Sequence, residues 1–314
     1  MRGAAARSWQ EPDPRPGRTC PLAYRYSPRV FDREPQLAAP TLYVVGGLYG
    51  NVEALDALEA LAAREPSAVA LVFNGDFHWF DVEPDDFAAV DRRVLAHRAI
   101  RGNVETEIAH DDEAAGCGCA YPADVSDADV SRSNAILARL RGTARRDHGA
   151  RARLAGLPMY LTARVGDARV AIVHGDASSL AGWGFAHDRL ADPRHARWVE
   201  SAFRDARVDV FASTHTCLPA LREFAGGVVA NNGAAGMPNF AATRFGLLTR
   251  ISTRPYAGPE KVSGLERAGA FVEALRIDYD HEAWARRFLR SWPAGSAAHD
   301  AYFRRITDGP RFAG

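Results

Sequence analysis

Short apolar runs alternate with amphipathic segments between positions 41 and 101 of the chain. Residues 41–45, 69–73 and 99–101 are rich in β-branched and apolar side chains, which predicts three buried strands. Between these runs, residues 52–61 and 84–97 carry apolar side chains at helical spacing, which predicts two amphipathic helices. Strands and helices that alternate in this order predict a parallel α/β arrangement with right-handed crossovers.

The pattern becomes mostly strand-like in the second half of the chain. Gly166-Asp167 separates two alternating runs, 160–165 and 169–173, and Gly at the first turn position is typical of a β-hairpin. A helix is expected at 194–207. Further β-rich runs lie at 208–212, 227–230, 245–251 and 272–279. We therefore expect a second sheet that packs face to face on the first.

The two ends of the chain differ from this body. Residues 1–40 contain seven prolines, a density that disfavours regular structure and predicts an extended arm whose aromatic second half docks on the body. Residues 282–307 have the pattern of two short helices interrupted at Trp292-Pro293. The expected organisation is an arm (1–40), an α/β domain (41–281) and a helical tail (282–314).

Composition restricts the classes of function. The chain has 47% hydrophobic and 25% charged residues, as ordinary globular proteins do, and its formal net charge of zero argues against nucleic-acid or membrane-surface binding. Lys261 is the only lysine among 39 lysines and arginines, so we assign no function to any arginine cluster. Four cysteines, no signal peptide and no membrane-length apolar run predict a cytoplasmic protein.

Four short polar motifs follow predicted strands. They are Asn74-Gly75-Asp76, Gly102-Asn103, His174-Gly175-Asp176 and Thr214-His215-Thr216. Ligands of open α/β sheets bind beyond the carboxyl ends of the strands, so Asp76, Asn103, His174 and His215 are expected to converge. One carboxylate, one amide and two imidazoles suit one divalent metal ion per chain, and zinc, manganese, iron and cobalt all fit these ligand types.

The order of these motifs resembles that of the calcineurin-like metallophosphoesterase superfamily, over roughly residues 41–281. That pattern is Asp-x-His, Gly-Asp, Gly-Asn-His-Asp/Glu, a lone His and Gly-His-x-His. The resemblance implies a four-layer α-β-β-α sandwich, in which two mixed β-sheets lie face to face and helices flank them. It also implies that Asp76 bridges two metals and that Asn103, His174 and His215 complete the second metal site.

The first metal site of the family is degenerate in this chain. Its Asp corresponds to Gly47, its first His to Tyr49 and its last His to Cys217, whose thiolate remains a possible ligand. The substrate-facing histidine corresponds to Val104. The resemblance therefore implies a divergent, mononuclear site in which a metal-activated water hydrolyses a phosphomonoester or phosphodiester. The alternative is a catalytically inactive binding or regulatory module with the same fold.

Other side chains near the motifs are candidates for supporting roles. His78 lies two residues after Asp76, so on extended backbone it would point the same way and could act as a replacement ligand or catalytic acid; the alternative is a packed histidine. Glu105, Asp81 and Asp176 are candidates to orient ligands by hydrogen bonds, although a plain turn carboxylate explains Asp176 equally well.

Cysteines and aromatic residues leave further alternatives open. Cys117 and Cys119 could join Cys217 in a soft-metal or redox-sensing site, or they are reduced loop thiols. Trp79, Phe80, Trp183 and Phe185 lie near the motif loops and either stack on a base or aryl group or pack in the core. The expected partner is a small, possibly nucleotide-like phosphoester, and homo-oligomerisation through the arm or tail is open.

Overall fold

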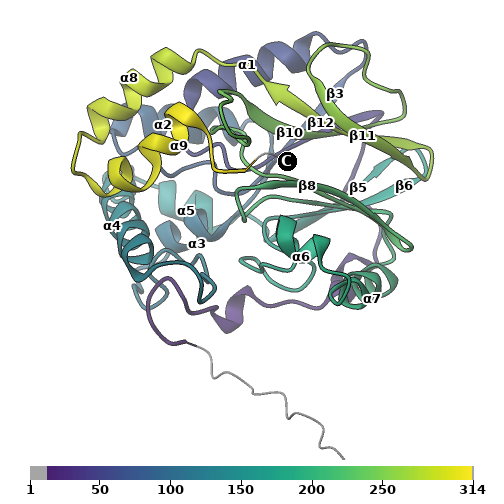
Figure 1. The fold of residues 1–314 in the computed structure, drawn as a ribbon, viewed down its shortest axis with the longest axis horizontal. Helices are drawn as coiled ribbons and strands as arrows, with labels where there is room; N and C mark the ends of the chain where they lie inside the picture. Colours follow the sequence, from purple (N-terminus) through teal and green to yellow (C-terminus); the bar gives the residue numbers. More distant parts are fainter. Residues whose placement is uncertain (1–12, 313–314) are drawn as a thin grey trace, which may run out of the picture.

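Two six-stranded sheets lie face to face at the centre of the protein. The computed structural model describes residues 13–312, so the first part of the predicted arm, residues 1–12, lies outside the described residues. One sheet has the order β1-β5-β6-β7-β9-β8 and the other β11-β12-β10-β2-β3-β4. In Figure 1, α1 and α8 lie outside the second sheet and α6 and α7 outside the first. The predicted four-layer sandwich is confirmed.

The strands of the first sheet are β1 (Leu37–Ala38), β5 (Tyr160–Val165), β6 (Ala168–Val173), β7 (Val210–Ser213), β8 (Pro219–Phe224) and β9 (Gly227–Asn232). Those of the second are β2 (Thr41–Val45), β3 (Val69–Asn74), β4 (Arg98–Ile100), β10 (Gly246–Ser252), β11 (Lys261–Arg267) and β12 (Ala270–Ile277). The α-helices are α1 (Val52–Ala63), α2 (Pro84–Val94), α3 (Asn103–Ala109), α4 (Asp127–Ala144), α5 (Ala150–Ala155), α6 (His187–Ala191), α7 (Ala196–Ala206), α8 (His281–Ser291) and α9 (Arg304–Asp308).

The core forms because successive side chains of the central strands point to opposite faces. On β2, Leu42 and Val44 pack into the layer between the sheets, where they share one cluster with Ile172 of the facing sheet. Tyr43 and Val45 point the other way, into the cluster beneath α1 and α8. Every residue of β2 is buried, as expected for a strand covered on both faces.

Parallel pairing brings the ligand-bearing loops together. β2, β3 and β4 are parallel neighbours in one sheet, and β6 and β7 are parallel neighbours in the other. The loops that follow these strands therefore leave at the carboxyl edges of the two sheets. The predicted motifs all lie in these loops.

Some strands and turns were not predicted from the sequence. β8 and β11 are edge strands in which charged residues interrupt the apolar alternation that marks a strand; β11 is largely exposed and β8 is mostly half-buried. The expectation that the arm has no regular structure is wrong for its second half. Short 3₁₀ turns at Leu22–Tyr24 and Pro28–Phe31 and the two-residue strand β1 are present, and Tyr24 and Phe31 are buried against the body. No helix within residues 13–312 combines the length and apolarity needed to cross a membrane.

Candidate metal centre

The loop after β3 presents Asp76 through a backbone shape that depends on glycine. Gly75 and Asp76 both have positive φ, 94° and 52°. A Cβ on Gly75 would lie 2.5 Å from the backbone nitrogen of Gly102 and 2.7 Å from Nδ1 of His174, so a side chain there would push apart the loops that form the site. Asp76 has room for its carboxylate because position 102 is glycine as well: a Cβ there would lie 2.2 Å from its Oδ1.

Glu105 ties the Asp76 loop to the start of α3. Its carboxylate is fully buried and accepts hydrogen bonds from the backbone N–H groups of Asp76 (2.8 Å), Gly102 (2.8 Å) and His78 (3.2 Å). The N–H of Val104 donates to Oδ1 of Asp76 at 3.1 Å. Glu105 therefore positions Asp76 through its backbone, in line with the predicted orienting role.

Hydrogen bonds fix which ring nitrogen of each histidine carries the proton. Nδ1 of His174 lies 2.9 Å from the carbonyl of Asn74, and Nε2 of His215 lies 3.1 Å from the carbonyl of Cys119. A carbonyl oxygen only accepts, so both of these nitrogens donate. The opposite nitrogens, Nε2 of His174 and Nδ1 of His215, consequently direct their lone pairs inward, as metal ligation requires.

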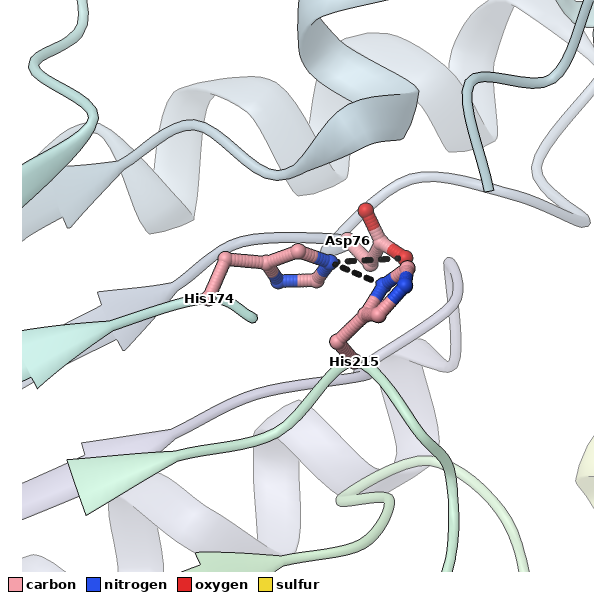
Figure 2. A group of neighbouring side chains, drawn as sticks. All are labelled: Asp76, His174 and His215. Carbon is pink, nitrogen blue, oxygen red and sulfur yellow. Dashed lines mark hydrogen bonds and ion pairs between the residues drawn. The ribbon is translucent and has the colours of Figure 1, made fainter. Parts of the chain in front are cut away.

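Four donor atoms that follow four different strands lie close together. Nε2 of His174 lies 3.1 Å from Nδ1 of His215, 3.0 Å from Oδ1 of Asn103 and 3.4 Å from Oδ2 of Asp76. Figure 2 shows the side chains of Asp76, His174 and His215 pointing toward one another, and their ligand atoms lie within 4.8 Å of each other. The structure thus brings together the four residues that the sequence motifs singled out.

The electrostatics of this cluster fit a cation. Two imidazole lone pairs only 3.1 Å apart repel each other unless a proton or a metal ion lies between them. Burial lowers the pKa of His174, but the Asp76 carboxylate outweighs burial and raises it above its usual value. Burial and the neighbouring His174 lower the pKa of His215 to about 3. The raised pKa shows that the position of Nε2 of His174 attracts a positive charge, and a metal ion bound there would displace the proton.

A tyrosine ring lies at the positions that correspond, by resemblance, to the first metal site of the family. Gly47 has a positive φ of 65°, and a Cβ there would lie 2.9–3.0 Å from ring atoms and Oη of Tyr49. The ring of Tyr49 therefore occupies the space into which a side chain at position 47 would project. Its hydroxyl lies 2.8 Å from Sγ of Cys217.

Cys217 does not join the convergent donor atoms. The group of metal-binding side chains within residues 13–312 contains Asp76, His174 and His215 but not this thiol. Burial raises the pKa of Cys217 above that of an ordinary thiol, although nearby Arg305 acts in the opposite direction. A raised pKa favours the protonated thiol, which is a poor ligand.

His78 points away from the cluster, contrary to the expectation from extended backbone. The left-handed conformation of Asp76 breaks the alternation that would have placed the two side chains on one side. Nδ1 of His78 lies 2.6 Å from Oδ2 of Asp81, Nε2 lies 3.6 Å from Oδ1 of Asp91, and the ring stacks on Phe87. The packed-histidine alternative describes this geometry.

Two other carboxylates predicted to support the ligands are bonded elsewhere. Oδ1 of Asp81 accepts from the N–H of Trp79, and its other oxygen faces His78. Asp176 accepts backbone N–H groups of Ser178 and Gly184. Asp176 therefore acts as a turn carboxylate, the alternative that the sequence left open.

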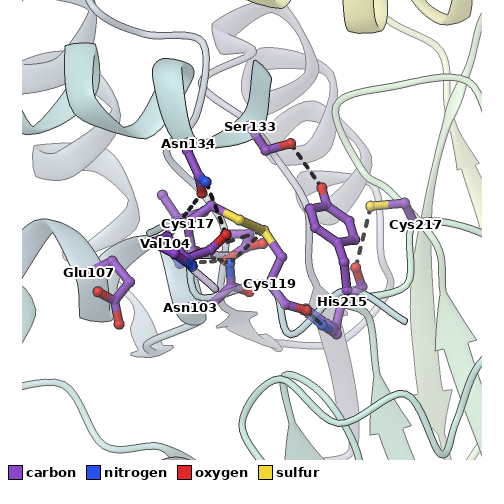
Figure 3. Close-up of a disulfide and its surroundings, with 12 residues drawn as sticks. Asn103, Val104, Glu107, Cys117, Cys119, Ser133, Asn134, His215 and Cys217 are labelled. Atoms are coloured by element: carbon purple, nitrogen blue, oxygen red, sulfur yellow. Dashed lines mark hydrogen bonds between the residues drawn. A yellow bond between two sulfur atoms is a disulfide. The ribbon is translucent and has the colours of Figure 1, made fainter. Parts of the chain in front are cut away.

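The Cys117–Cys119 loop orients two of the ligands through its backbone. The structure pairs these cysteines as a disulfide, and in that state neither sulfur is a thiolate that can bind metal; the soft-metal site and the reduced thiols both stay predictions. The carbonyl of Cys117 accepts from Nδ2 of Asn103 at 2.9 Å, and that of Cys119 accepts from His215. Figure 3 shows Asn103 and His215 on either side of the disulfide. Disulfides are rare in reducing compartments, so the cytoplasmic location stays a prediction.

A pocket of about 190 Å³ opens beside the donor cluster. Trp79 and Trp183 line it, whereas Phe80 and Phe185 pack in the core. The ring of Trp183 meets that of His215 edge-on, with centroids 5.4 Å apart. The remaining lining residues are Tyr49, Asp76, Asn103, Val104, Cys119, Tyr121, His215, Thr216, Cys217, Tyr302 and Arg305.

Sequence reasoning missed the two contributions of the tail to this pocket. Tyr302 and Arg305 come from the last turns of the chain and carry no motif. Arg305 was also indistinguishable from other arginines in so arginine-rich a sequence. The sequence predicted only that the tail forms two short helices, and it left open whether these helices cap the sheets or form a dimer surface.

Two facing mixed sheets with a metal-ligand cluster at their carboxyl edges define the calcineurin-like metallophosphoesterase fold. The chain is similar to a hypothetical protein from Pyrococcus horikoshii (18% identity, TM-score 0.60, covering 88% of this chain and 100% of that one). It is also similar to a metallophosphoesterase from Sphaerobacter thermophilus (16% identity, TM-score 0.51, covering 86% and 100%). No family model and no curated protein matches. The predicted resemblance is thus confirmed at the level of the fold.

Proposed function

We propose that this protein is a metal-dependent phosphoesterase with one metal ion per chain, held by Asp76, Asn103, His174 and His215. The observation that carries the proposal is the pair of imidazole nitrogens, 3.1 Å apart, whose protons are fixed on the far side of each ring. A metal ion in such a site activates water and polarises a phosphoryl oxygen. Zinc, manganese, iron and cobalt all suit this mixed nitrogen and oxygen set.

The protein groups around the ligands favour substrates with good leaving groups. Val104 stands where the resemblance places a proton-donating histidine, and a buried valine donates no proton to a departing alkoxide. Loss of a general acid and of one metal removes several kcal/mol of transition-state stabilisation. Each loss of about 1.36 kcal/mol lowers the rate tenfold. Esters of acidic alcohols, such as aryl phosphates, suffer least from this loss.

The aromatic walls of the pocket indicate the kind of alcohol. Trp79, Tyr121 and Trp183 line the space next to the donor cluster, and Tyr121 and Trp183 contact each other with ring centroids 6.0 Å apart. Such rings bind flat aryl groups and bases by stacking. We therefore propose a small phosphoester with an aryl or nucleotide-like group as the substrate class.

One observation favours the alternative of an inactive binding module. The ring of Tyr49 occupies the space of a side chain at position 47, where the resemblance places a ligand of the first metal, and this disfavours two-metal chemistry. A binding module would still hold a metal or a phosphoester without turning it over. Activity therefore has to be measured separately from binding.

The test combines metal content with a substrate screen. Protein purified without a histidine tag is analysed by elemental mass spectrometry, beside His174→Ala and the control His195→Ala, whose ring bonds the carbonyl of Gly184 outside the cluster. We expect one metal per chain in the wild type and control and none in His174→Ala. Hydrolysis of 4-nitrophenyl phosphate and bis(4-nitrophenyl) phosphate should follow the metal.

The outcomes separate the alternatives. Metal without hydrolysis of either ester or of nucleotides would favour the binding module. Two metals per chain would contradict the mononuclear site and return Cys217 to the ligand set. Absence of metal after incubation with zinc or manganese would overturn the phosphoesterase proposal.

A further inference from the structure

Arg305 brings a positive charge from the C-terminal tail into the pocket. It belongs to α9 and lines the pocket together with Asp76 and His215. Its Nη2 group donates to the backbone carbonyl of Cys217 and, at 3.3 Å, to that of Pro238. These two bonds anchor the guanidinium next to the loop that carries His215.

The remaining donors of this guanidinium have no protein acceptor. Nε of Arg305 is buried and makes no hydrogen bond within residues 13–312. Nη1 has no hydrogen-bond partner, and the guanidinium no ion pair, in this part of the chain; the hydrogen bonds of Arg305 both involve Nη2. Because Nε is inaccessible, Nη1 is the donor that an anionic oxygen in the pocket can reach.

The charge lies on the side of the pocket where the first metal is missing. Arg305 bonds the carbonyl of Cys217, whose thiol in turn contacts the hydroxyl of Tyr49. Positions 49 and 217 are those that would ligate the first metal by resemblance.

We infer that Arg305 binds a non-bridging phosphoryl oxygen of the ligand and supplies the positive charge that the missing first metal would have supplied. This inference rests on the proposed function for its ligand class. Arginine suits the task because its planar guanidinium stays charged and its N–H groups match phosphate oxygens. The helical tail, which was expected to be a separate segment, thereby becomes part of the binding site.

A purely structural role would account for only one nitrogen of Arg305. The anchoring bonds to Cys217 and Pro238 use Nη2, and a lysine or a neutral donor at this position could replace them. Nη1, which has no hydrogen-bond partner within residues 13–312, is left for a further ligand. Removing the guanidinium should therefore weaken anion binding more than it lowers stability.

The experiment measures binding of inorganic phosphate to the metal-loaded, full-length protein by isothermal titration calorimetry. Arg305→Met is compared with Arg304→Met, which removes an exposed guanidinium from the same helix (76% side-chain exposure). We expect at least about a tenfold loss of phosphate affinity in Arg305→Met, since hydrogen bonds to charged groups contribute about 1.5–3 kcal/mol. Arg304→Met and the metal content of both variants should match the wild type.

A second variant and a second measurement guard against misfolding. Arg305→Lys keeps the charge but loses the planar N–H pair, so its phosphate affinity should fall between those of the wild type and Arg305→Met. Near-ultraviolet circular dichroism reports whether the aromatic pocket is intact. In the wild type, the Nε–H resonance of Arg305, assigned by its absence in Arg305→Lys, should shift when phosphate is added.

Hydrolysis of 4-nitrophenyl phosphate on the same samples distinguishes the two proposals. Phosphate binding that depends on Arg305 in a protein without turnover would uphold this inference while the phosphoesterase proposal fails. Turnover by the wild type with equal phosphate affinity in all folded variants would overturn the role of Arg305 alone. An Nε–H resonance that does not shift at saturating phosphate would also overturn the role of Arg305.

Discussion

At the scale of single residues, the side chain that position 47 can carry depends on the tyrosine at position 49. The tyrosine ring lies 2.9–3.0 Å from where a Cβ on Gly47 would be, closer than carbon atoms ordinarily approach. An acidic residue at 47 and a tyrosine at 49 are therefore incompatible in this backbone. The printed sequence shows two separate departures from the motif, and their steric coupling follows only from the fold.

Rebuilding the first metal site should consequently require simultaneous changes. Gly47→Asp alone should destabilise the protein by about 1–3 kcal/mol, because the new side chain collides with the buried ring. Gly47→Asp/Tyr49→His/Cys217→His removes the collision and restores three ligands. We expect this triple variant to bind two metals per chain instead of one, as measured by elemental mass spectrometry.

Gly269→Asp is the matched control for backbone strain. Gly269 has a φ of 72°, similar to that of Gly47, but a Cβ there meets nothing within 4 Å. Its substitution should cost only the left-handed backbone term, about 1 kcal/mol. Equal losses of melting temperature in Gly47→Asp and Gly269→Asp, or one metal in the triple variant, would contradict the steric account.

At the scale of elements, the sequence predicted strands better than the paths of loops. Asp76, Asn103, His174 and His215 could be placed together because each follows a strand, and parallel strands end at a common edge. The direction of His78 could not be predicted, since it depends on the left-handed backbone of Asp76.

The Cys117–Cys119 loop shows the same limit, because its function lies in its carbonyl groups. Its backbone bonds the side chains of Asn103 and His215, which the sequence presents as separate motifs. Nothing in the spacing of two cysteines indicates that their carbonyls orient metal ligands. Tertiary contacts of this kind are visible only once the chain is folded.

Breaking the disulfide should loosen both ligands. Cys117→Ser/Cys119→Ser removes the covalent link that holds the two carbonyls, and loss of such supporting contacts typically lowers metal affinity 10- to 100-fold. Competition with a chromogenic chelator measures the dissociation constant. Cys20→Ser is the control, because this free thiol contacts Ser179 instead of the ligands. Unchanged metal affinity in the double variant would mean that the loop holds its shape without the bridge.

At the scale of the whole molecule, the metal site and a buried charge network lie at different positions along β2. Gly46 follows the carboxyl end of this strand, whereas Tyr43, its middle residue, donates to Glu65 at 2.8 Å. Glu65 pairs with Arg250 at 2.6 Å, and Arg250 also pairs with Glu273 at 2.7 Å, all three with side chains at most 3% exposed. This network joins the end of α1 to the middle of the second sheet.

The separation predicts that stability and metal binding can be changed independently. Glu65→Gln leaves Arg250 with one carboxylate and should lower the free energy of unfolding by about 2–4 kcal/mol at pH 7. The chain should still bind one metal, because no ligand contacts the network. Glu266→Gln is the control, since this exposed glutamate of β11 makes no ion pair within residues 13–312.

The pH dependence of unfolding tests the same network. Burial raises the pKa of Glu65, but its bonds to Arg250 and Tyr43 outweigh burial and lower the pKa below its ordinary value of 4.5. The stabilisation is therefore fully present above about pH 4.5 and is lost as the pH falls through the lowered pKa. Denaturant titrations should show a steeper loss of stability below pH 4.5 in the wild type than in Glu65→Gln, so the two curves converge in acid. Parallel curves would contradict the stabilising role of the Glu65 carboxylate. Loss of metal from Glu65→Gln at pH 7 would show that the charge network and the metal site are not independent.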